Sequence, residues 1–598
     1  MKLVRSAAFA VAIFTASAAT AADTLKWNNW NDELFSRATA EKRFVILDLE
    51  AVWCHWCHVM EKTTYSDPKV IELLASNYIP VRVDQDANPD LSSRYGDWGW
   101  PATIVFGPDG TEIAKIRGYI EPERMQALLK AVIDDPSPGP SAGKTFEVTP
   151  SAKAFLPKEE RAELIKNYNE SYEEVLGGWG DSQKYIDADS MDYAISRAEA
   201  GDADAAKRAR QTLDAALVLI DRTWGGVFQY SEGGSWSKPH FEKIISFQSQ
   251  YLRQYSHAYA LWKDPKYLAA ARDIERYLVD FMRSPDGAFY VSQDADLNHD
   301  VDGHKFYPLD DAGRRALGMP RIDKNLYARE NGWAISGLTA LYNVTDDPKV
   351  IAAAEGAAKW VIANRALPEG GFKHSDKDRG GPFMGDTATM GQAFLDLYGA
   401  TGDRNWLTRA AKAGDFVAAN FKDAAGGYLT SKTSEGKTGV FAKPAKLMDE
   451  QIQIVRFMNL LDRYYGNDVY RENALHGMRY LAGAAAEMIR PLAGVLIADD
   501  ELSIEPTHIT IVGHKDDPRA KALDATARAF PARYKRLEWL DLREGKLPNP
   551  DVEYPDLGEP AAFACSNRIC SYPSFNADEL KKTVEQMAKL KVKRASLD

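Results

Sequence analysis

Two cysteines near the start of the chain, Cys54 and Cys57, have a spacing suited to redox chemistry. They enclose two residues in the sequence Cys54-His55-Trp56-Cys57, after a short apolar run and before a helical pattern. Two sulfur atoms at this spacing can join within one helical turn, and the start of a helix stabilises a thiolate on the first cysteine. The motif predicts that Cys54 attacks and Cys57 resolves, with His55 and Trp56 facing a partner.

Two further residues occupy places that the thioredoxin fold uses around such a centre. Asp48 lies six residues before Cys54, at the end of a predicted strand, where a buried acid can take the proton of the resolving cysteine. Pro101 precedes another predicted strand, where that fold carries a cis-proline. The bulk of Trp100 is expected to shape the partner groove. Cys54, Cys57, Asp48 and Pro101 are thus the predicted catalytic residues.

The same stretch has three other interpretations. C-x-x-C-H is also the attachment motif of c-type haem. Two cysteines with His55 and His58 can bind a soft metal, although adjacent residues do not easily complete one tetrahedron. The pair can also be a purely structural disulfide. The preceding strand, Asp48 and Pro101 favour the thioredoxin interpretation, which needs no metal or other cofactor.

The charges and the first residues of the 598-residue chain indicate its partners and its compartment. There are 74 basic and 86 acidic residues, a net charge of −12, which argues against nucleic acid as a partner. Residues 1–22 are predicted to be a signal peptide, with two basic residues, a short apolar stretch and the cleavage pattern Ala19-Thr20-Ala21. We therefore expect a periplasmic or secreted protein with no membrane contact after cleavage. An uncleaved N-terminal anchor is the alternative.

Strand and helix signals alternate over residues 23–135, as a thioredoxin-like α/β domain requires. Residues 136–155 begin Pro-Ser-Pro-Gly-Pro and are predicted to be a linker. From 156 to 490 the pattern is helical, with glycine–aromatic turns recurring roughly every 50 to 80 residues. A ring of helical hairpins, the (α/α)6 toroid, fits this pattern, and a plain helical solenoid is the alternative. Residues 491–598 return to a small α/β pattern.

Polar residues in the helical region are candidates for a carbohydrate site. In toroid glycosidases, paired carboxylates in loops at one end of the ring act as acid and base. The competing interpretation is structural, because Asp and Glu at helix starts are usually N-caps. The acidic run 294–303 places Leu309 where a calcium-binding EF-hand needs glutamate, so a solvated loop is expected there. The toroid candidates are His240, Glu242, Asp294, Asp296 and Glu330.

Several stretches together resemble a known family. The run from Cys54 to Glu61 (CHWCHVME) looks like the signature of the YyaL-type, or spermatogenesis-associated protein 20-type, family of thioredoxin-domain proteins. The resemblance covers nearly the whole chain after residue 22. It implies a thioredoxin-like domain fused to an (α/α)6 toroid of the six-hairpin glycosidase type, and it leaves the reaction open. Further matches are PHFEK (239–243), SQDAD (292–296), GHKFY (303–307) and the late pair Cys565 and Cys570.

That late pair has two interpretations. In an oxidising compartment Cys565 and Cys570 are expected to form a structural disulfide that fixes the C-terminal loop. The alternative is an internal redox partner that exchanges with Cys54.

The sequence therefore favours an exported thiol–disulfide oxidoreductase joined to a six-hairpin glycosidase-like domain that binds a partner or a glycan. The expected partners are protein thiols and disulfides, together with a carbohydrate. The alternative is a carbohydrate-active enzyme, a glycosidase or sugar epimerase, with an accessory thioredoxin domain. A binding protein without catalysis is the third hypothesis.

Overall fold

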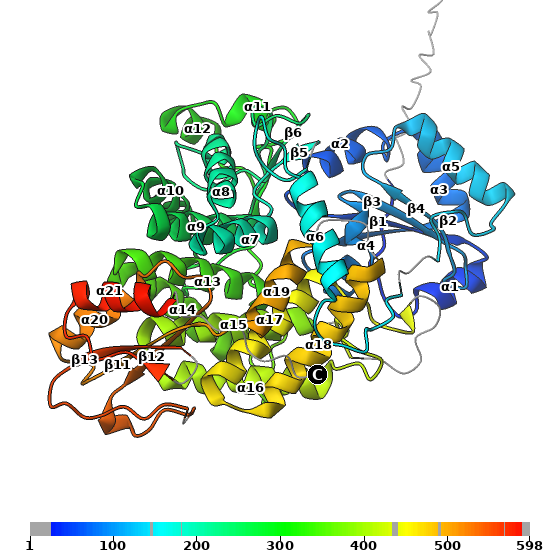
Figure 1. Ribbon diagram of the computed structural model, residues 1–598. Helices are drawn as coiled ribbons and strands as arrows, with labels where there is room; N and C mark the ends of the chain where they lie inside the picture. The colour runs from blue at the N-terminus through cyan, green and yellow to red at the C-terminus, as the bar shows by residue number, and fades with distance from the viewer. Residues whose placement is uncertain are drawn as a thin grey trace, which may run out of the picture.

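The computed structural model describes residues 25–143, 147–180, 182–378, 380–432, 441–487, 492–549, 551–566 and 569–588. The predicted signal peptide lies outside these residues. Among the described residues, no helix combines the length and the apolar character that a membrane span needs. Figure 1 shows an N-terminal α/β unit in blue, a large helical ring from cyan to yellow, and a C-terminal α/β unit in orange and red. The predicted multidomain fold class is confirmed.

The N-terminal unit is a thioredoxin-like fold around the sheet order β2-β1-β3-β4. Strand β1 (Phe44–Glu50) runs parallel to β2 (Tyr78–Asp84) and antiparallel to β3 (Ala102–Phe106), which pairs with β4 (Glu112–Arg117). Helices α1 (Leu34–Glu41) and α4 (Pro89–Tyr95) cover one face. The other face is covered by α2 (His55–Thr63), α3 (Pro68–Asn77) and α5 (Pro122–Asp134).

The first four residues of β1 are apolar because the strand is covered on both faces. Val45 and Leu47 pack toward α1 and α4, whereas Ile46 packs toward α2, α3 and α5. Side chains alternate between the faces of a strand, so a strand covered on both sides needs a continuous apolar run. This sandwich fixes the end of β1, from which the Cys54 loop leaves.

The helical region closes into a ring of six hairpins. Each inner helix contacts the next, and the last inner helix returns to the first. The inner helices are α7 (Ala188–Glu199), α9 (Ile245–Trp262), α13 (Ala328–Thr345), α15 (Met384–Thr401), α17 (Met448–Tyr465) and α19 (Ala493–Ser503). Their outer partners, in the same order, are α8 (Ala203–Ala216), α10 (Pro265–Asp280), α14 (Pro348–Arg365), α16 (Arg404–Asn420), α18 (Asp468–Glu487) and α6 (Lys158–Glu170).

This closure confirms the toroid, and the solenoid alternative is wrong. The sixth hairpin joins the first helix of the ring, α6, to the last, α19. Because α19 begins at Ala493, the ring extends beyond the boundary that the sequence placed at 490. Inner helices pack closely; at Gly391 of α15 an added Cβ would come within 2.5 Å of the Phe457 ring.

Short strands and helices lie at the end of the ring that faces the thioredoxin-like unit. Two small sheets have the strand orders β5-β6-β7 and β10-β9-β8. The PHFEK stretch lies on β7 and β8, SQDAD starts on β9, and GHKFY lies on and just after α11. The elements are β5 (Gln183–Lys184), β6 (Tyr230–Glu232), β7 (Pro239–His240), β8 (Lys243–Ile244), β9 (Ser292–Gln293), β10 (Ile322–Asp323), α11 (Gly303–Phe306) and α12 (Asp311–Leu317).

The C-terminal unit repeats the strand order of the N-terminal sheet. Its order is β12-β11-β13-β14, with β11 (Thr507–Val512) parallel to β12 (Lys535–Leu540) and antiparallel to β13 (Ala561–Ser566). Strand β14 (Ile569–Cys570) pairs with β13, α20 (Pro518–Arg528) connects the parallel strands, and α21 (Ala577–Ala588) follows. Pro560 precedes β13 as Pro101 precedes β3, but Gly513-His514-Lys515 follows β11 in place of a cysteine motif. The unit therefore has a second, smaller thioredoxin-like topology.

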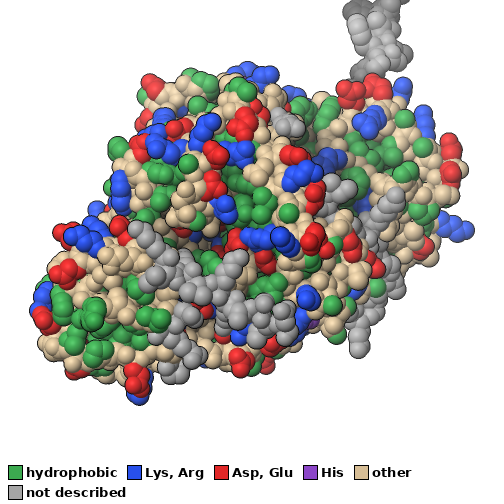
Figure 2. All heavy atoms as spheres, viewed as in Figure 1, with side chains coloured by type: hydrophobic (Ala, Val, Ile, Leu, Met, Phe, Trp, Pro, Cys, Tyr) green, Lys and Arg blue, Asp and Glu red, His purple; other side chains and the backbone are tan. Residues whose placement is uncertain are grey.

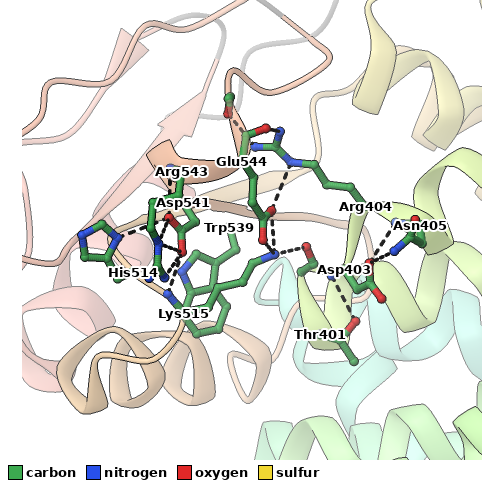
Figure 3. Close-up of polar contacts among 12 residues, drawn as sticks. Thr401, Asp403, Arg404, Asn405, His514, Lys515, Trp539, Asp541, Arg543 and Glu544 are labelled. Carbon is green, nitrogen blue, oxygen red and sulfur yellow. Dashed lines mark hydrogen bonds and ion pairs between the residues drawn. The ribbon is translucent and has the colours of Figure 1, made fainter.

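Polar contacts join this C-terminal unit to the ring (Figure 3). Lys515 Nζ donates to the carbonyl of Gly402, just after α15, at 2.7 Å and pairs with Glu544 at 2.8 Å. Arg404 at the start of α16 donates to the carbonyls of Glu544 and Lys546. Hydrophobic side chains also gather on the surface over this unit, at the lower left of Figure 2.

The two α/β units lie at opposite ends of the ring (Figure 1). The thioredoxin-like unit meets the N-terminal ends of the inner helices, near Ile244 and Glu330. The C-terminal unit meets their C-terminal ends, where Leu537 N donates to Tyr464 of α17. An inner helix such as α13 has 18 residues, about 27 Å.

The separation between the two α/β units bears on the two interpretations of the late cysteine pair. Cys565 and Cys570 are opposite residues of β13 and β14 and form a disulfide. They stand at the end of the ring away from Cys54 (Figure 1), which favours the structural interpretation over direct exchange between the two pairs.

Part of the predicted linker is attached to the thioredoxin-like sheet. Gly139 N donates to the carbonyl of Ile113 at 2.8 Å, and Ser141 Oγ accepts from Lys115 N at 2.9 Å. Residues 139–143 thus lie along β4, and the exposed stretch of this connection is 134–138.

Candidate functional site

The Cys54–Cys57 pair forms a disulfide at the start of α2. Cys54 is the N-cap of this helix, and its sulfur accepts the backbone N–H of Cys57 at 3.1 Å. The Trp100–Pro101 peptide bond is cis, as the sequence predicts, and it leads into β3 next to β1. The structure therefore assembles the cysteine pair at a helix N-terminus in a thioredoxin-like sheet.

The disulfide is covered by the helical ring. Cys54 is 3% exposed and Cys57 4% exposed. Ile244 from the start of α9 packs in one apolar cluster with both cysteines, and Phe247 and Trp100 border that cluster. Trp100, the residue expected to shape the partner groove, thus packs at the contact with the ring, while Trp56 remains 38% exposed.

Asp48 is buried on the central strand β1, and its basic neighbour, Arg82, was not predicted from the sequence. Its Oδ2 accepts from Arg82 Nε at 3.0 Å. Burial raises the pKa of Asp48 to about 6, although the charge of Arg82 opposes the shift. Asp48 and Arg82 are directly opposite in the parallel register of β1 and β2, so aligning the two strands would have found the pair.

Three of the five toroid candidates lie against the cysteine motif. Glu242 Oε1 accepts the backbone N–H of His55 at 3.3 Å. Asp296 Oδ2 lies 2.6 Å from His55 Nδ1, and Asp294 Oδ2 lies 3.6 Å from His58 Nε2. The hydrogen bond with Asp296 raises the pKa of His55. Burial opposes ionisation of Asp296, but its hydrogen bond with His55 and the nearby His58 lower its pKa.

His240 stands at the edge of this group. Its Nε2 lies 3.1 Å from Glu232 Oε2, its ring stacks on Tyr230, and its Nδ1 is 4.0 Å from Glu242 Oε2. Lys243, the last residue of PHFEK, is fully buried and donates to Asp221 at 2.7 Å and to the carbonyl of Gly225 at 2.8 Å. The lysine of this motif therefore holds the fold together.

A cavity of about 1160 Å³ opens between the thioredoxin-like unit and the ring. Among the five toroid candidates, Glu330 alone lines it. Trp53 and Trp100 line it too, and both also contact the apolar cluster around the disulfide. The cavity is thus one side-chain layer away from the sulfur atoms. Its other aromatic and acidic lining residues include Trp98, Trp333, Phe247, Asp86, Asp187, Asp189 and Glu450.

A polar network missed by sequence reasoning ties the two domains together beside this cavity. His374 Nδ1 lies 2.9 Å from Asp386 Oδ1, and its Nε2 donates to the carbonyl of Asp86 at 2.8 Å. The Asp386 carboxylate and the Asp86 carbonyl both accept hydrogen bonds, so the His374 imidazole is held in its protonated form. Burial lowers the pKa of His374, but Asp386 raises it to about 9. Arg329 pairs with Glu330 in the same network at 2.9 Å. A single histidine in a loop carries no sequence signal for this role.

Glu450 in the cavity wall provides a test of its electrostatics. Burial raises the pKa of Glu450 to about 8, from 4.5. Above pH 4.5 the unfolded chain releases this proton, whereas the folded protein keeps it up to about pH 8. The free energy of unfolding therefore falls between pH 4.5 and about 8 because of this carboxyl group. We expect Glu450→Gln to match the wild type at pH 4.5 and to be more stable at pH 8.5, by up to a few kcal/mol at about 1.4 kcal/mol per pKa unit.

Urea unfolding at the two pH values measures this difference. Glu163→Gln, at a half-exposed position on α6, is the control and should show no pH-dependent gain. A Glu450→Gln variant equally destabilised at both pH values would contradict a protonated Glu450.

Comparisons with known proteins agree with the two-part architecture. Residues 17–133 match a family model described as "Thioredox_DsbH: Protein of unknown function, DUF255". Uncharacterized protein B0495.5 of Caenorhabditis elegans is 22% identical over 93% of this chain and 94% of its own length. Spermatogenesis-associated protein 20 of Homo sapiens is 23% identical, over 93% of this chain and 89% of its own. The resemblance inferred from the motifs is thereby confirmed.

Similarity confined to one domain extends to other proteins. Thiol:disulfide interchange protein DsbD of Pseudomonas fluorescens is 38% identical over 12% of this chain and 13% of its own length. Among solved structures, a sugar epimerase from a ruminal bacterium covers 53% of this chain and 84% of its own at 14% identity and a TM-score of 0.42. A glycoside hydrolase family 76 (mannosidase) protein of Bacteroides thetaiotaomicron covers 57% of this chain and 99% of its own, at 11% identity and a TM-score of 0.40.

Proposed function

We propose that this protein is an exported thiol–disulfide oxidoreductase whose redox centre is Cys54–Cys57. The observation that carries the proposal is the disulfide at the N-terminus of α2, next to a cis-proline and a buried acid. The signal-like first 22 residues and the two disulfides support a periplasmic or secreted location, where disulfides persist. The helical ring binds the partner or a glycan beside the redox centre.

The exchange reaction needs only the two cysteines and a proton acceptor. In the reduced protein, the Cys54 thiolate attacks a partner disulfide, forms a mixed disulfide and releases one partner thiolate. Cys57 then gives its proton to Asp48, attacks Cys54 and releases the second partner thiolate. The partner gains two electrons and the protein ends with the Cys54–Cys57 disulfide. The reverse sequence oxidises a partner dithiol.

The side chains that pack over the two sulfur atoms restrict which substrates can reach them. A folded protein surface cannot reach a cysteine that is 3% exposed beneath Ile244 and Phe247. The adjacent cavity, which shares Trp53 and Trp100 with the disulfide cluster, offers the nearest route. The expected substrate is therefore an extended peptide or a small disulfide that enters through this cavity.

Asp48→Asn tests the proposed proton transfer. The variant is expected to slow oxidation of the dithiol at pH 7 on the order of 100-fold, because Cys57 loses its base. The wild-type rate should fall as the pH drops below about 6, where Asp48 becomes protonated, and this dependence should vanish in the variant. Stopped-flow tryptophan fluorescence of the reduced protein mixed with a small disulfide measures both.

Asp134→Asn, at an exposed acid of the same domain, is the matched control and should keep the wild-type rate and pH profile. If Asp48→Asn retained both as well, Asp48 would have no part in the reaction.

We propose a second role, carbohydrate binding, for the cavity itself. Its wall combines tryptophan rings, which stack on sugars, with carboxyl groups. Burial holds Glu450 protonated at neutral pH, and Glu330 lies 2.9 Å from Arg329. A protonated carboxyl group can donate a hydrogen bond to a sugar hydroxyl.

Calorimetric titration with a panel of oligosaccharides tests this role. We expect saturable binding that is lost in Trp333→Ala and weakened in Glu330→Gln, while Trp360→Ala, on an outer helix away from the cavity, keeps it. Turnover of a bound sugar would favour the carbohydrate-active enzyme over a binding domain. No binding by any member of the panel would contradict the carbohydrate role.

A further inference from the structure

The seam between the two domains holds a group of metal-ligand side chains that thiol–disulfide exchange does not use. We call His58, Asp294 and Asp296 the seam cluster. His58 comes from the first turns of α2 in the thioredoxin-like unit, and the aspartates come from the ring, just after β9. One nitrogen of His58 and one oxygen of each carboxylate all lie within 4.8 Å of one another. A single ion could therefore contact all three.

Both carboxylates of the seam cluster are oriented by backbone hydrogen bonds. Asp294 Oδ1 accepts the N–H of Asp296 at 2.9 Å, and Asp296 Oδ1 accepts the N–H of Gly303 at 2.9 Å. Gly303 can approach because it has no side chain; a Cβ there would lie 2.6 Å from the Phe241 ring. Each Oδ2 is left facing the histidines. Metal-binding carboxylates are commonly fixed in this way by a second hydrogen bond.

The distances around His58 suit a bridging ion better than a direct bond. His58 Nε2 is 3.6 Å from Asp294 Oδ2, and His58 Nδ1 is 3.9 Å from Asp296 Oδ2. Both distances exceed a hydrogen bond. One ion takes only one nitrogen of the imidazole, and it would lie between that nitrogen and the two carboxylate oxygens, which are all within 4.8 Å of one another. By contrast, His55 Nδ1 makes a direct bond of 2.6 Å to Asp296 Oδ2 and fixes the position of that oxygen.

An unpartnered buried carboxylate lies at the same seam. The side chain of Glu242 is 4% exposed, and its Oε1 bonds the backbone of His55. Its Oε2 accepts no hydrogen bond from the described residues. The Nδ1 atom of His240 lies 4.0 Å from this oxygen, beyond hydrogen-bond distance. A buried carboxylate oxygen without a donor is costly, and a nearby cation would offset that cost.

We propose that the seam cluster binds one divalent first-row transition-metal ion between the two domains. His58, Asp294 Oδ2 and Asp296 Oδ2 are the ligands, His55 positions Asp296, and a fourth place remains for water. One imidazole and two carboxylates are a donor set that suits Zn²⁺ or Mn²⁺. Because the ligands come from both domains, the ion holds the ring over the disulfide.

Titration of the oxidised full-length protein with ZnCl₂ and MnCl₂ in a calorimeter tests the site. The disulfide form is used so that the cysteine thiols cannot bind the metal. We expect one ion per chain, with affinity lowered at least about tenfold in His58→Gln and in Asp294→Asn. His299→Gln and His304→Gln, at exposed histidines of the same loop region, are matched controls and should bind like the wild type.

A second measurement tests the position of the ion between the domains. We expect saturating Zn²⁺ to slow reduction of Cys54–Cys57 by a phosphine reductant several-fold in the wild type and to have no effect in Asp294→Asn. Circular dichroism confirms that each variant is folded. The proposal is overturned by absence of saturable binding, by undiminished binding in both ligand variants, or by a reduction rate that the bound metal leaves unchanged. None of these results depends on oxidoreductase activity.

Discussion

Replacing Cys54 with serine is expected to abolish thiol–disulfide exchange, with a loss of at least about a thousandfold. A serine hydroxyl is not ionised near neutral pH and cannot attack a disulfide as the thiolate does. The late cysteine pair cannot substitute, because Cys565 and Cys570 lie at the opposite end of a ring about 27 Å deep. The effect should therefore be a loss of the reaction rather than a slower version of it.

The rate at which the pre-reduced protein reduces a small disulfide and an extended peptide with an internal disulfide measures this loss. A Cys565→Ser/Cys570→Ser double variant is the control and should keep the wild-type rate. Cys57→Ala should accumulate a mixed disulfide on Cys54, detected by peptide mass spectrometry. Exchange that persisted in Cys54→Ser and disappeared in the double variant would move the redox centre to the C-terminal unit.

Replacing Asp221 with asparagine is expected to lower the free energy of unfolding by about 3 to 5 kcal/mol. Asp221 accepts from Lys243 and from Arg314, each at 2.7 Å, and all three side chains are buried. Asparagine would leave two adjacent buried cations without an anion. Burial opposes ionisation of Asp221, but the two cations lower its pKa to about 2.

Denaturant unfolding at pH 7 and at lower pH measures this contribution. Because the pKa of Asp221 is lowered from 3.8 to about 2, its stabilisation is complete above pH 3.8 and is lost as the pH falls through 2. Asp273→Asn removes an ion pair with Arg222, which is 56% exposed, and should cost at most about 1 kcal/mol. An Asp221→Asn variant no less stable than this control would show that the buried trio is not needed.

The parts of the site that lie within one domain could be predicted from the sequence. Cys54, Asp48 and Pro101 have fixed places relative to the strands of a thioredoxin-like sheet, so spacing along the chain was enough to position them. The ring could be predicted as well, because each hairpin buries an apolar face and turns at glycine. In both cases the information is local and periodic.

The parts that depend on how the domains meet could not be predicted. Glu242, Asp294 and Asp296 have the residue types and the loop positions of a sugar site, and they do lie at one end of the ring. The thioredoxin-like unit covers that end, so these carboxylates face His55 and His58 instead of the open cavity. The burial of Cys54 by Ile244 has the same origin, since no periodicity encodes the packing of one domain on another.

The pairing of α6 with α19 sets the order in which the chain can be completed during biosynthesis. The thioredoxin-like unit has all its strands and helices once residue 134 has emerged, whereas the ring cannot close until α19 has been made. Domains generally fold as units from the N-terminus during synthesis. Before the ring closes, Ile244 and Phe247 therefore do not yet pack against Cys54 and Cys57. In that period a cellular oxidant can reach the pair directly, whereas in the finished protein access is limited to small or extended molecules that enter through the cavity.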